Sequence, residues 1–325
     1  MNSKSTSAID TGPDASADTG TGTGTGTGTS SGTSAASRAK LAADNRRGII
    51  YMSASMALFI ANDGLTKYVS ATLPTGQLIF LRGVMSILLV LAVAQALGVL
   101  PKIKLAFAPR VLLRALIDAT ATMLYLASLF HLPIGNATAI NLASPLFMIV
   151  FAVLFLGEGI SLTRALAIGA GFFGVLLVIQ PRADGFNAWA LVCLFGTLFH
   201  AARDLLTRRI PAGIPSILIT LSTAIAVTLI SGAISVVEGW RAFSALDLLM
   251  LGLAAAFLSG GYYFIISCMR AGEMSLIAPF RYSGLLFALL LGYFIWDEVP
   301  NALAWSGIAL LIGSGLYLLM KNTRN

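Results

Sequence analysis

Arginines stand inside the most apolar stretches of this sequence, where a charge is costly to keep. Arg82 and Arg281 each lie well within a long hydrophobic block. A charge at the centre of a bilayer costs roughly 2.5–3.5 kcal/mol on insertion scales, so such positions are seldom kept without a function. A guanidinium group donates forked hydrogen bonds to carbonyl, carboxylate or phosphate oxygens. The two arginines therefore predict a polar cavity that binds an anionic or heterocyclic solute.

Other polar residues with the same kind of placement complete the predicted cavity. Tyrosines offer ring faces and hydroxyl groups, asparagines offer amide hydrogen bonds, and aspartates and a histidine offer exchangeable protons. The predicted substrate-binding residues are Asp63, Arg82, Asp118, Tyr125, Asn141, His200, Asp204, Tyr263, Arg281 and Tyr282, with Tyr262 and Asn136 as similar neighbours. Lys67 and Arg208 are predicted gating or ion-pair residues.

A structural role competes with solute binding for the buried arginines. Arg82 could pair with Asp63, and Arg281 could pair with Asp204 or Asp118, which would hold the helices together. The two roles overlap because a protein that changes conformation can break such pairs and form them again.

Similar alternatives apply to the remaining charges. Arg114 is four residues before Asp118 and could pair with it on one helix face, although we expect Arg114 to snorkel to the membrane interface. Lys67 and Arg208 could pair with the aspartates four residues earlier, or simply complement a helix dipole and anchor in headgroups. A packing role is favoured over proton transfer for His200.

Two further sites stay open in the sequence. Asn141 could bind solute or could satisfy the backbone near Pro145. Glu158 and Glu298 follow apolar segments at the interface, and they are interpreted as markers of loop geometry and not as proton carriers.

Enzyme chemistry finds little support. The sequence contains no HExxH or GxSxG motif and no Cys/His cluster. Cys193 and Cys268 form neither a metal-binding spacing nor a disulfide framework, and they are expected to be buried small hydrophobes. We therefore predict no enzyme activity, no cofactor and no metal, and keep an intramembrane enzyme as the alternative of another class.

Composition points to a membrane protein. Of the residues, 57% are hydrophobic and 11% are charged, whereas a soluble domain carries about a quarter charged residues. Apolar blocks of about twenty residues are long enough to span a bilayer as helices. The net charge of +7 lies at segment ends without interleaved aromatic residues, which argues against a nucleic-acid partner.

Prolines and polar loops divide the chain into ten apolar segments, which predict an all-α membrane protein with ten transmembrane helices. The predicted helices are 48–68, 75–97, 110–130, 133–156, 162–180, 187–207, 214–237, 246–268, 274–296 and 302–320.

Basic residues set the expected orientation. With the N-terminus inside, the outer ends hold only Lys67, Arg182 and Arg241, and the inner ends hold most of the others. Lysine and arginine favour the cytoplasmic side, so both termini are predicted to be cytoplasmic in a bacterial inner membrane. Residues 1–45 are rich in Gly, Thr, Ser and Ala, and they predict a disordered cytoplasmic tail.

The chain repeats itself. Asp63, Thr66, Lys67 and Pro74 each recur 141 positions later as Asp204, Thr207, Arg208 and Pro215. Each half contains five segments, an odd number, so the second half must be inverted in the membrane. We predict one repeat over 46–181 and a second over 186–321. Inverted repeats are common in secondary transporters.

The sequence resembles the drug/metabolite transporter superfamily, specifically bacterial permeases with two EamA-type domains. The resemblance is carried by "LPIGNATAINLASPLFMIVFAVLFLGE" and "IGAGFFGVLLV" in the first half, and by "EMSLIAPFRYSGLLFALLLGYFIWDEVP" and "WSGIALLIGSGLYLL" in the second. It implies that segments 1–4 and 6–9 surround a central cavity and that segments 5 and 10 pack outside it. Among such permeases, the motifs are most similar to uptake carriers for riboflavin or S-adenosylmethionine.

We therefore predict a secondary transporter that works by alternating access, with uptake of riboflavin or a similar heterocyclic metabolite as first candidate. Export of amino acids or related metabolites is the alternative. The expected partners are a small-molecule solute and the lipid bilayer, in a monomer or homodimer. Close helix packing is expected at Gly169, Gly171, Gly174, Gly307, Gly313 and Gly315.

Overall fold

The computed structural model describes the backbone of residues 30–156, 161–180, 187–207, 209–211, 213–271 and 277–322. The chain divides into a unit of residues 1–41 and a unit of residues 42–325. The described part of the first unit, residues 30–41, is helical. The second unit contains the packed helices.

The described residues form eleven α-helices and two short 3-10 helices, with no β-strand among them. The α-helices are α1 (Ser30–Val69), α2 (Thr75–Ala96), α3 (Pro109–Leu129), α4 (Ile134–Asn141), α5 (Ser144–Leu156), α6 (Leu162–Ile179), α7 (Ala188–Thr207), α8 (Ser216–Glu238), α9 (Ala245–Ala271), α11 (Ser283–Trp296) and α12 (Ala302–Asn322). The 3-10 helices are η1 (Leu100–Phe107) and η2 (Ala278–Tyr282). Helices suit this composition because their backbone groups bond within the segment and need no water.

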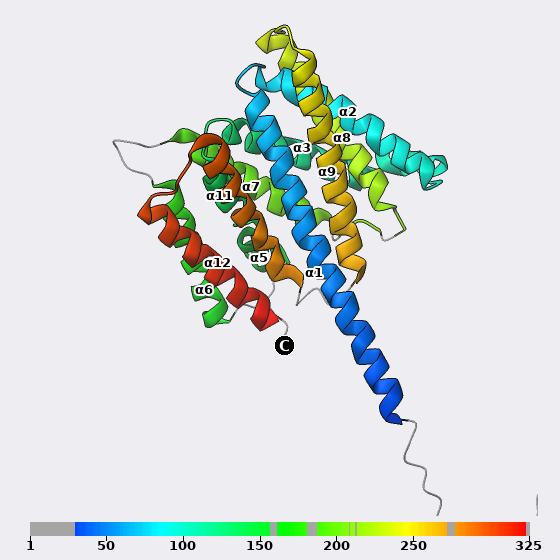
Figure 1. Cartoon of the computed structure of the whole chain (residues 1–325), viewed down its shortest axis with the longest axis vertical. Helices are drawn as coiled ribbons and strands as arrows, with labels where there is room; N and C mark the ends of the chain where they lie inside the picture. Colours follow the sequence, from blue (N-terminus) through cyan, green and yellow to red (C-terminus); the bar gives the residue numbers. More distant parts are fainter. Residues whose placement is uncertain are drawn as a thin grey trace, which may run out of the picture. The chain divides into compact units, whose positions relative to one another are not determined.

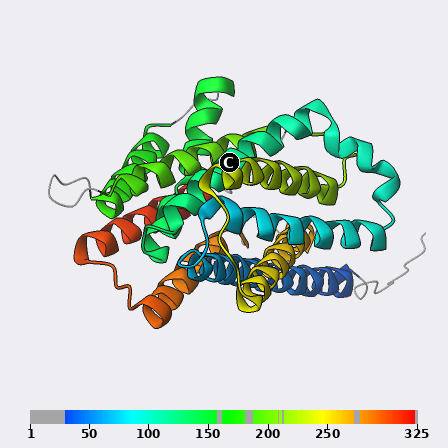
Figure 2. The ribbon, with the colours of Figure 1, turned by 90° about the horizontal axis from the view of Figure 1, so that it is seen from above.

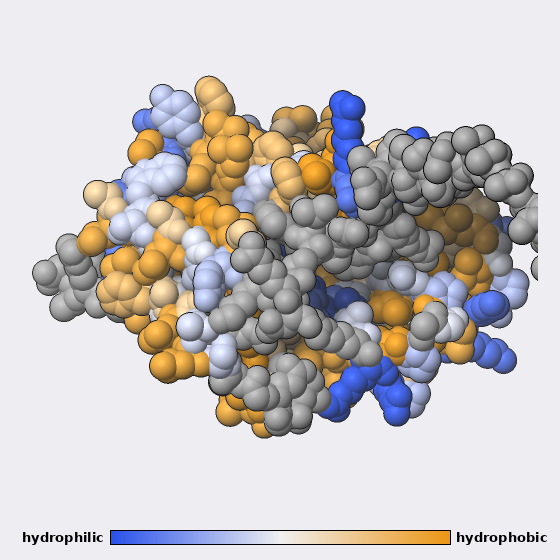
Figure 3. Space-filling view, turned by 90° about the horizontal axis from the view of Figure 1, so that it is seen from below, coloured by the Kyte–Doolittle hydropathy of each residue, from blue (hydrophilic) through white to orange (hydrophobic). Residues whose placement is uncertain are grey.

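The helices have the length and surface of membrane spans. Seven stretches in the described residues are long and apolar enough to cross a bilayer, and three shorter apolar stretches lie at 165–179, 280–296 and 302–318. Large apolar side chains face outward, including Leu88 (62% exposed) and Phe294 (78%). Hydrophobic residues also cover much of the coloured surface in Figure 3. The predicted all-α membrane fold is confirmed.

The predicted segments coincide with helical backbone, and two differences have physical causes. Segment 133–156 is divided into α4 and α5, because Pro145 cannot donate a backbone hydrogen bond inside a continuous helix. Helix α1 begins at Ser30, well before the expected residue 48, so residues 30–45 are helical although they were expected in the disordered tail. Alanine, leucine, arginine and lysine between 35 and 47 favour helix.

Glycines bring α6 and α12 into close contact, and the two helices lie side by side in Figure 1. A Cβ atom on Gly174 would lie 2.7 Å from the carbonyl oxygen of Gly307, so these backbones touch. Gly171 and Gly315 also have close neighbours, whereas Gly169 and Gly313 have none within 4 Å. The expected packing role is thus confirmed at four positions and wrong at Gly169 and Gly313.

Helix α2 packs along α8, and α3 packs against α7 and α8. Gly83 of α2 meets Thr228 of α8, and the two helices run next to each other in Figure 2. These contacts join elements from the first half of the sequence to elements from the second half. The interior of the bundle is therefore shared between the halves.

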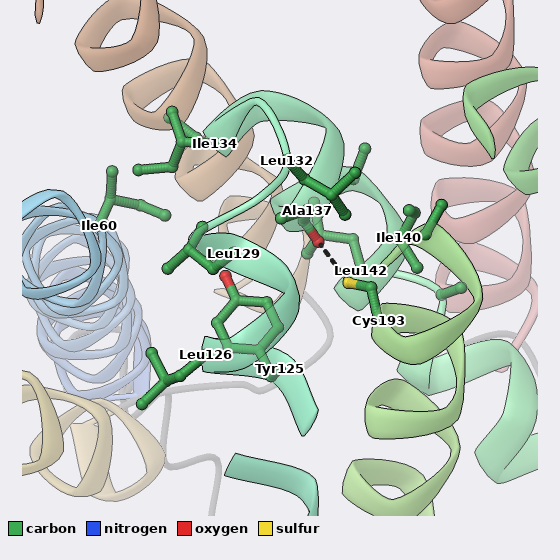
Figure 4. Packing of buried hydrophobic residues seen from close by; sticks show 14 of the residues in the cluster. Ile60, Tyr125, Leu126, Leu129, Leu132, Ile134, Ala137, Ile140, Leu142 and Cys193 are labelled. Atoms are coloured by element: carbon green, nitrogen blue, oxygen red, sulfur yellow. Dashed lines mark hydrogen bonds between the residues drawn. The ribbon is translucent and has the colours of Figure 1, made fainter. Parts of the chain in front are cut away.

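Helix α1 lies between α9 and α11. Ser55 donates a hydrogen bond to the carbonyl oxygen of Gly261 in α9 (2.8 Å), and a Cβ atom on Gly64 would collide with Leu291 of α11. Figure 4 shows the apolar core beside α1, where Ile60 faces Leu129 and Ile134. The polar side chains of α1 are consequently held against the centre of the bundle.

Candidate functional site

Asp63 is the centre of a buried polar group that we call the Asp63 cluster: Asn62, Asp63, Arg82 and Tyr125. The phenol of Tyr125 donates to one carboxylate oxygen of Asp63 at 2.9 Å, and the amide of Asn62 donates to the other at 2.9 Å. Arg82 donates to the side-chain oxygen of Asn62 at 3.1 Å. The cluster thus joins α1, α2 and α3.

The direct pair between Arg82 and Asp63, considered as the structural alternative, does not form. Among the described residues, no ion pair within 4.0 Å joins them, and Asn62 bonds to both. Asn62 directly precedes Asp63 but was not predicted to take part. An uncharged amide can both donate and accept, so it bridges a cation and an anion that cannot reach each other.

Two hydrogen-bonding groups near the cluster have no partner in the protein. The Nε atom of Arg82 and the hydroxyl oxygen of Ser86, one turn later on α2, are both buried without a hydrogen bond. Arg82 is 4% exposed and Ser86 is 5% exposed. Nearly all buried polar groups in proteins find a partner, so these two mark a place where a solute oxygen or a water molecule fits.

His200 and Asn141 extend the polar interior beyond the Asp63 cluster. A ring nitrogen of His200 in α7 lies 2.9 Å from the side-chain oxygen of Asn141, the last residue of α4. The ring centroids of His200 and Tyr125 are 6.0 Å apart. The Asn141 side-chain oxygen therefore bonds to a histidine, which favours a site role over satisfying the backbone near Pro145.

A second buried group, the Asp118 cluster, contains Arg114, Asp118, Arg203 and Asp204. Arg203 lies 2.7 Å from Asp118 and 2.9 Å from Asp204, and Arg114 lies 3.3 Å from Asp118. The predicted Arg114–Asp118 pair is confirmed. Arg281 was considered as a partner of either aspartate, but among the described residues no ion pair joins it to them, and Arg203 bonds to both.

Arg114 has three acceptors. Its guanidinium donates to Thr223 and to the exposed Thr207 at 2.8 Å each, besides the contact to Asp118. One end of the guanidinium thus reaches the exposed end of α7, and the other end is held inside the bundle. The Asp118 cluster thereby ties α3 to α7 and α8.

Of the two neighbouring tyrosines in α9, Tyr262 lies within electrostatic reach of Arg82 and Asp118, and Tyr263 lies on the outer surface. Tyr263 is 67% exposed and faces outward, whereas its neighbour Tyr262 turns inward onto Phe59 (ring centroids 5.3 Å apart). Consecutive helical residues point about 100° apart, so only one of the two can face the interior. In this structure the interior position belongs to Tyr262 and not to the predicted Tyr263.

The second-half candidates are only partly placed in a site. The hydroxyl of Tyr282 meets Gly315 of α12, so this tyrosine packs against an outer helix. Arg281 is half-buried in η2, beside Tyr282 in sequence. Arg208 and Glu158 lie outside the described residues.

Lys67 is the centre of a third polar group. It lies at the end of the bundle where α1 ends, and we call this end of the bundle the Lys67 end. Its ammonium lies 2.5 Å from Glu298 and donates to the carbonyl oxygen of Leu132 at 2.6 Å. It also sits 4.9 Å from the ring centroid of Trp296. The second oxygen of Glu298 accepts from the backbone N–H of Ile134 at 2.8 Å.

The expected pair of Lys67 with Asp63 is therefore wrong, because Asp63 bonds to Tyr125 and Lys67 bonds to Glu298. Glu298 is more than a marker of loop geometry. Segments 48–68 and 274–296 are the first and ninth of the ten predicted helices, so both end on the same side of the membrane. This was the signal that could have paired Lys67 with Glu298.

Two cavities open at the Lys67 end. One of about 550 Å³ is lined by residues that include His131, Trp240 and Arg241. The other, of about 380 Å³, is lined by residues that include Asn136 and Glu298. Both volumes fall in the range of small-molecule sites. In the described part of the chain, no three His, Cys, Asp or Glu side chains gather as metal ligands.

Comparison with known proteins gives one family. Residues 46–180 and 187–320 each match the model of the EamA-like transporter family. A riboflavin transporter of Rhizobium johnstonii is 28% identical over 66% of this chain and 71% of its own length. A pseudopaline exporter of Pseudomonas aeruginosa is 25% identical over 82% of this chain and 94% of its own.

An S-adenosylmethionine uptake transporter of Rickettsia conorii is 24% identical over 85% of this chain and 94% of its own length. One solved crystal structure superimposes with a TM-score of 0.61 at 16% identity, over 86% of this chain and 99% of the other. That likeness supports the fold alone.

Proposed function

The chain belongs to the EamA-like transporter family, and on this premise we propose that it carries a small organic metabolite across the bacterial inner membrane by alternating access. The two halves would rock around a shared site near the middle of the bundle. Basic residues at the segment ends favour cytoplasmic termini, which would turn the Lys67 end outward.

The observation that carries the proposal is the unfilled hydrogen-bonding capacity of Arg82. Its Nε atom is buried beside an equally unfilled Ser86 hydroxyl, and its other end is fixed by Asn62. A buried donor without an acceptor costs about 1–3 kcal/mol, more for a charged group. A carbonyl or carboxylate oxygen of a solute would recover that cost, so the site favours solutes that present such an oxygen.

Riboflavin or a similar heterocyclic metabolite is the first candidate substrate. Its class offers ring carbonyl oxygens for Arg82 and a flat surface for the rings of Tyr125 and His200. Relatives from Rhizobium johnstonii and Brucella anthropi are named riboflavin transporters. Asp63, Asp118, Asp204 and His200 remain candidates for proton coupling.

Export of amino acids or related metabolites is the second candidate. It is favoured by the match to a pseudopaline exporter, which covers 82% of this chain, more than the 66% covered by the riboflavin transporter from Rhizobium. The Asp118 cluster contains both arginines and aspartates, which are complementary to the carboxylate and the ammonium group of an amino acid.

A growth screen separates the candidates. The gene is expressed in bacteria that cannot make riboflavin, S-adenosylmethionine or nucleosides, and growth is followed at low supply of each. Rescue by riboflavin is the expected result. If none of the three metabolites rescues growth and the cells become resistant to toxic amino-acid analogues, export is the function and uptake is rejected.

Variants then test the binding site. Arg82→Ala should abolish uptake, and Arg82→Lys should also fail because lysine keeps the charge but loses the forked geometry. Leu88→Ala, on the exposed face of the same helix, is the matched control and should transport normally. Arg281→Ala tests the remaining predicted arginine. Normal uptake in both alanine variants, at normal protein level, would refute the cavity assignment.

A further inference from the structure

Glu298 holds together three elements from both halves of the chain. Its two oxygens bond to Lys67 at the end of α1 and to the first backbone N–H of α4 at Ile134. Lys67 in turn bonds to Leu132 in the turn before α4. One carboxylate thus connects α11, in the second half, to two helices of the first half.

The backbone turn at the end of α11 sets the position of Glu298. Asp297, the residue after α11, adopts a left-handed backbone with φ of 54°, which is uncommon for a residue other than glycine. The N–H of Asp297 bonds back to the carbonyl oxygen of Tyr293, and the N–H of Glu298 bonds back to that of Gly292, each at 3.1 Å. The first of these bonds is that of an αL helix cap. The reversal fixes where the Glu298 side chain begins.

The contact is shielded from water, unlike its neighbours. The side chains of Lys67 and Glu298 are 9% and 19% exposed. Another link between the halves at this end, from Gln180 to Asn301, is exposed. A shielded ion pair resists opening, because separating it leaves a charge in a poor environment.

We propose that the Lys67–Glu298 contact and its cap on Ile134 form a latch that closes the Lys67 end and opens during each transport cycle. The latch rests on the proposed transport function. Glu298 also lines the 380 Å³ cavity, and Asp63 lies one helical turn before Lys67. Opening the latch joins that cavity to the Asp63 cluster.

A native thiol reports the state of the latch. Cys193 of α7 is fully buried and its sulfur lies 3.6 Å from the carbonyl oxygen of Ala137, three residues along α4 from Ile134. Figure 4 shows this contact next to Leu132 and Ile140. When Glu298 releases the start of α4, the cover over Cys193 is lost and its labelling accelerates.

The experiment measures the labelling rate of Cys193 with a membrane-impermeant maleimide, in a Cys268→Ala background and without any solute. Right-side-out and inside-out vesicles are compared, so that each face is probed. Glu298→Gln and Lys67→Met should each raise the rate at least about tenfold from one side, since a hydrogen bond to a charged group contributes about 1.5–3 kcal/mol. That side identifies the face that holds the Lys67 end.

Glu238→Gln is the matched control. Glu238 also accepts a backbone N–H at the start of a first-half helix, that of Gly76 in α2 at 2.7 Å, but no ion pair to it occurs among the described residues. Its labelling rate should stay at the parent value. The exchange Lys67→Glu with Glu298→Lys restores the pair without the cap on Ile134 and should recover protection in part.

Unchanged labelling from both sides in Glu298→Gln would overturn the latch, and so would an equal rise in Glu238→Gln. The latch would also be overturned if the single variants label faster and the charge-exchange variant labels just as fast as they do. Loss of fold, and not loss of the ion pair, would then explain the faster labelling. Because no solute is present, these outcomes are separate from failure of the proposed substrate.

Discussion

Replacing Asp118 by asparagine should lower the stability of the folded protein more than a substitution at an exposed position of α3 does. Asp118 is 2% exposed and lies 2.7 Å from Arg203 and 3.3 Å from Arg114. Asparagine keeps the volume and removes the charge. Two guanidinium groups from α3 and α7 are then left close together without their shared anion.

The magnitude follows from these distances. At an effective dielectric constant of about 20, the two attractions amount to roughly 6 and 5 kcal/mol. Most of that is offset by the cost of moving three charges out of water, and breaking a buried pair by removing one partner typically costs about 3–5 kcal/mol. The melting temperature should therefore fall by roughly 5–15 °C.

The assay uses the two cysteines, Cys193 and Cys268, which are both buried. A thiol-reactive dye brightens as the purified protein unfolds on heating. Leu116→Ala, at a position of α3 that is 52% exposed, is the control and should melt like the parent. Adding Arg203→Gln should cost less in the Asp118→Asn background than alone, because the two residues interact. An Asp118→Asn protein that melts with the parent would refute this account.

Two further changes test contacts between helices. Gly174→Leu should lower the melting temperature clearly, because its Cβ would lie 2.7 Å from the Gly307 carbonyl oxygen, whereas Gly169→Leu meets nothing within 4 Å and should be neutral. Equal melting of both leucine variants would contradict the close approach. Tyr125→Phe removes the 2.9 Å hydrogen bond to Asp63 and should cost about 1.5–3 kcal/mol in the same assay. An unchanged melting curve would mean that Asp63 finds another donor.

The helices were predictable because the signals for them are local. Runs of apolar residues set their length, and Pro74, Pro133 and Pro215 directly precede three of the helices that the structure contains. The break between α4 and α5 also has a local cause in Pro145, but the sequence was interpreted as one continuous segment. A proline near the start of a helix and a proline that kinks a longer helix look the same in sequence.

The polar contacts were harder to predict because they depend on which helix faces which. Three pairings considered from the sequence do not occur among the described residues: Lys67 with Asp63, Arg82 with Asp63, and Arg281 with Asp118 or Asp204. The prediction paired residues that are near in sequence or in matching positions of the repeat. The actual partners, such as Asn62 for Arg82 and Arg203 for Asp118, follow from packing that the apolar pattern does not encode. Only the pair from Arg114 to Asp118, on one helix, was within reach of local reasoning.

The touching backbones of α6 and α12 have a consequence for synthesis of the protein. Helix α6 ends at Ile179, and its partner α12 is complete only at Asn322. At roughly 5–20 residues per second, a ribosome needs about 7–29 seconds to make the intervening chain. During that time Gly174 lacks its neighbours on α12, whereas Gly171 already has Leu146 of α5 beside it. Insertion must therefore keep an unfinished helix surface from pairing wrongly until the last helix of the chain arrives.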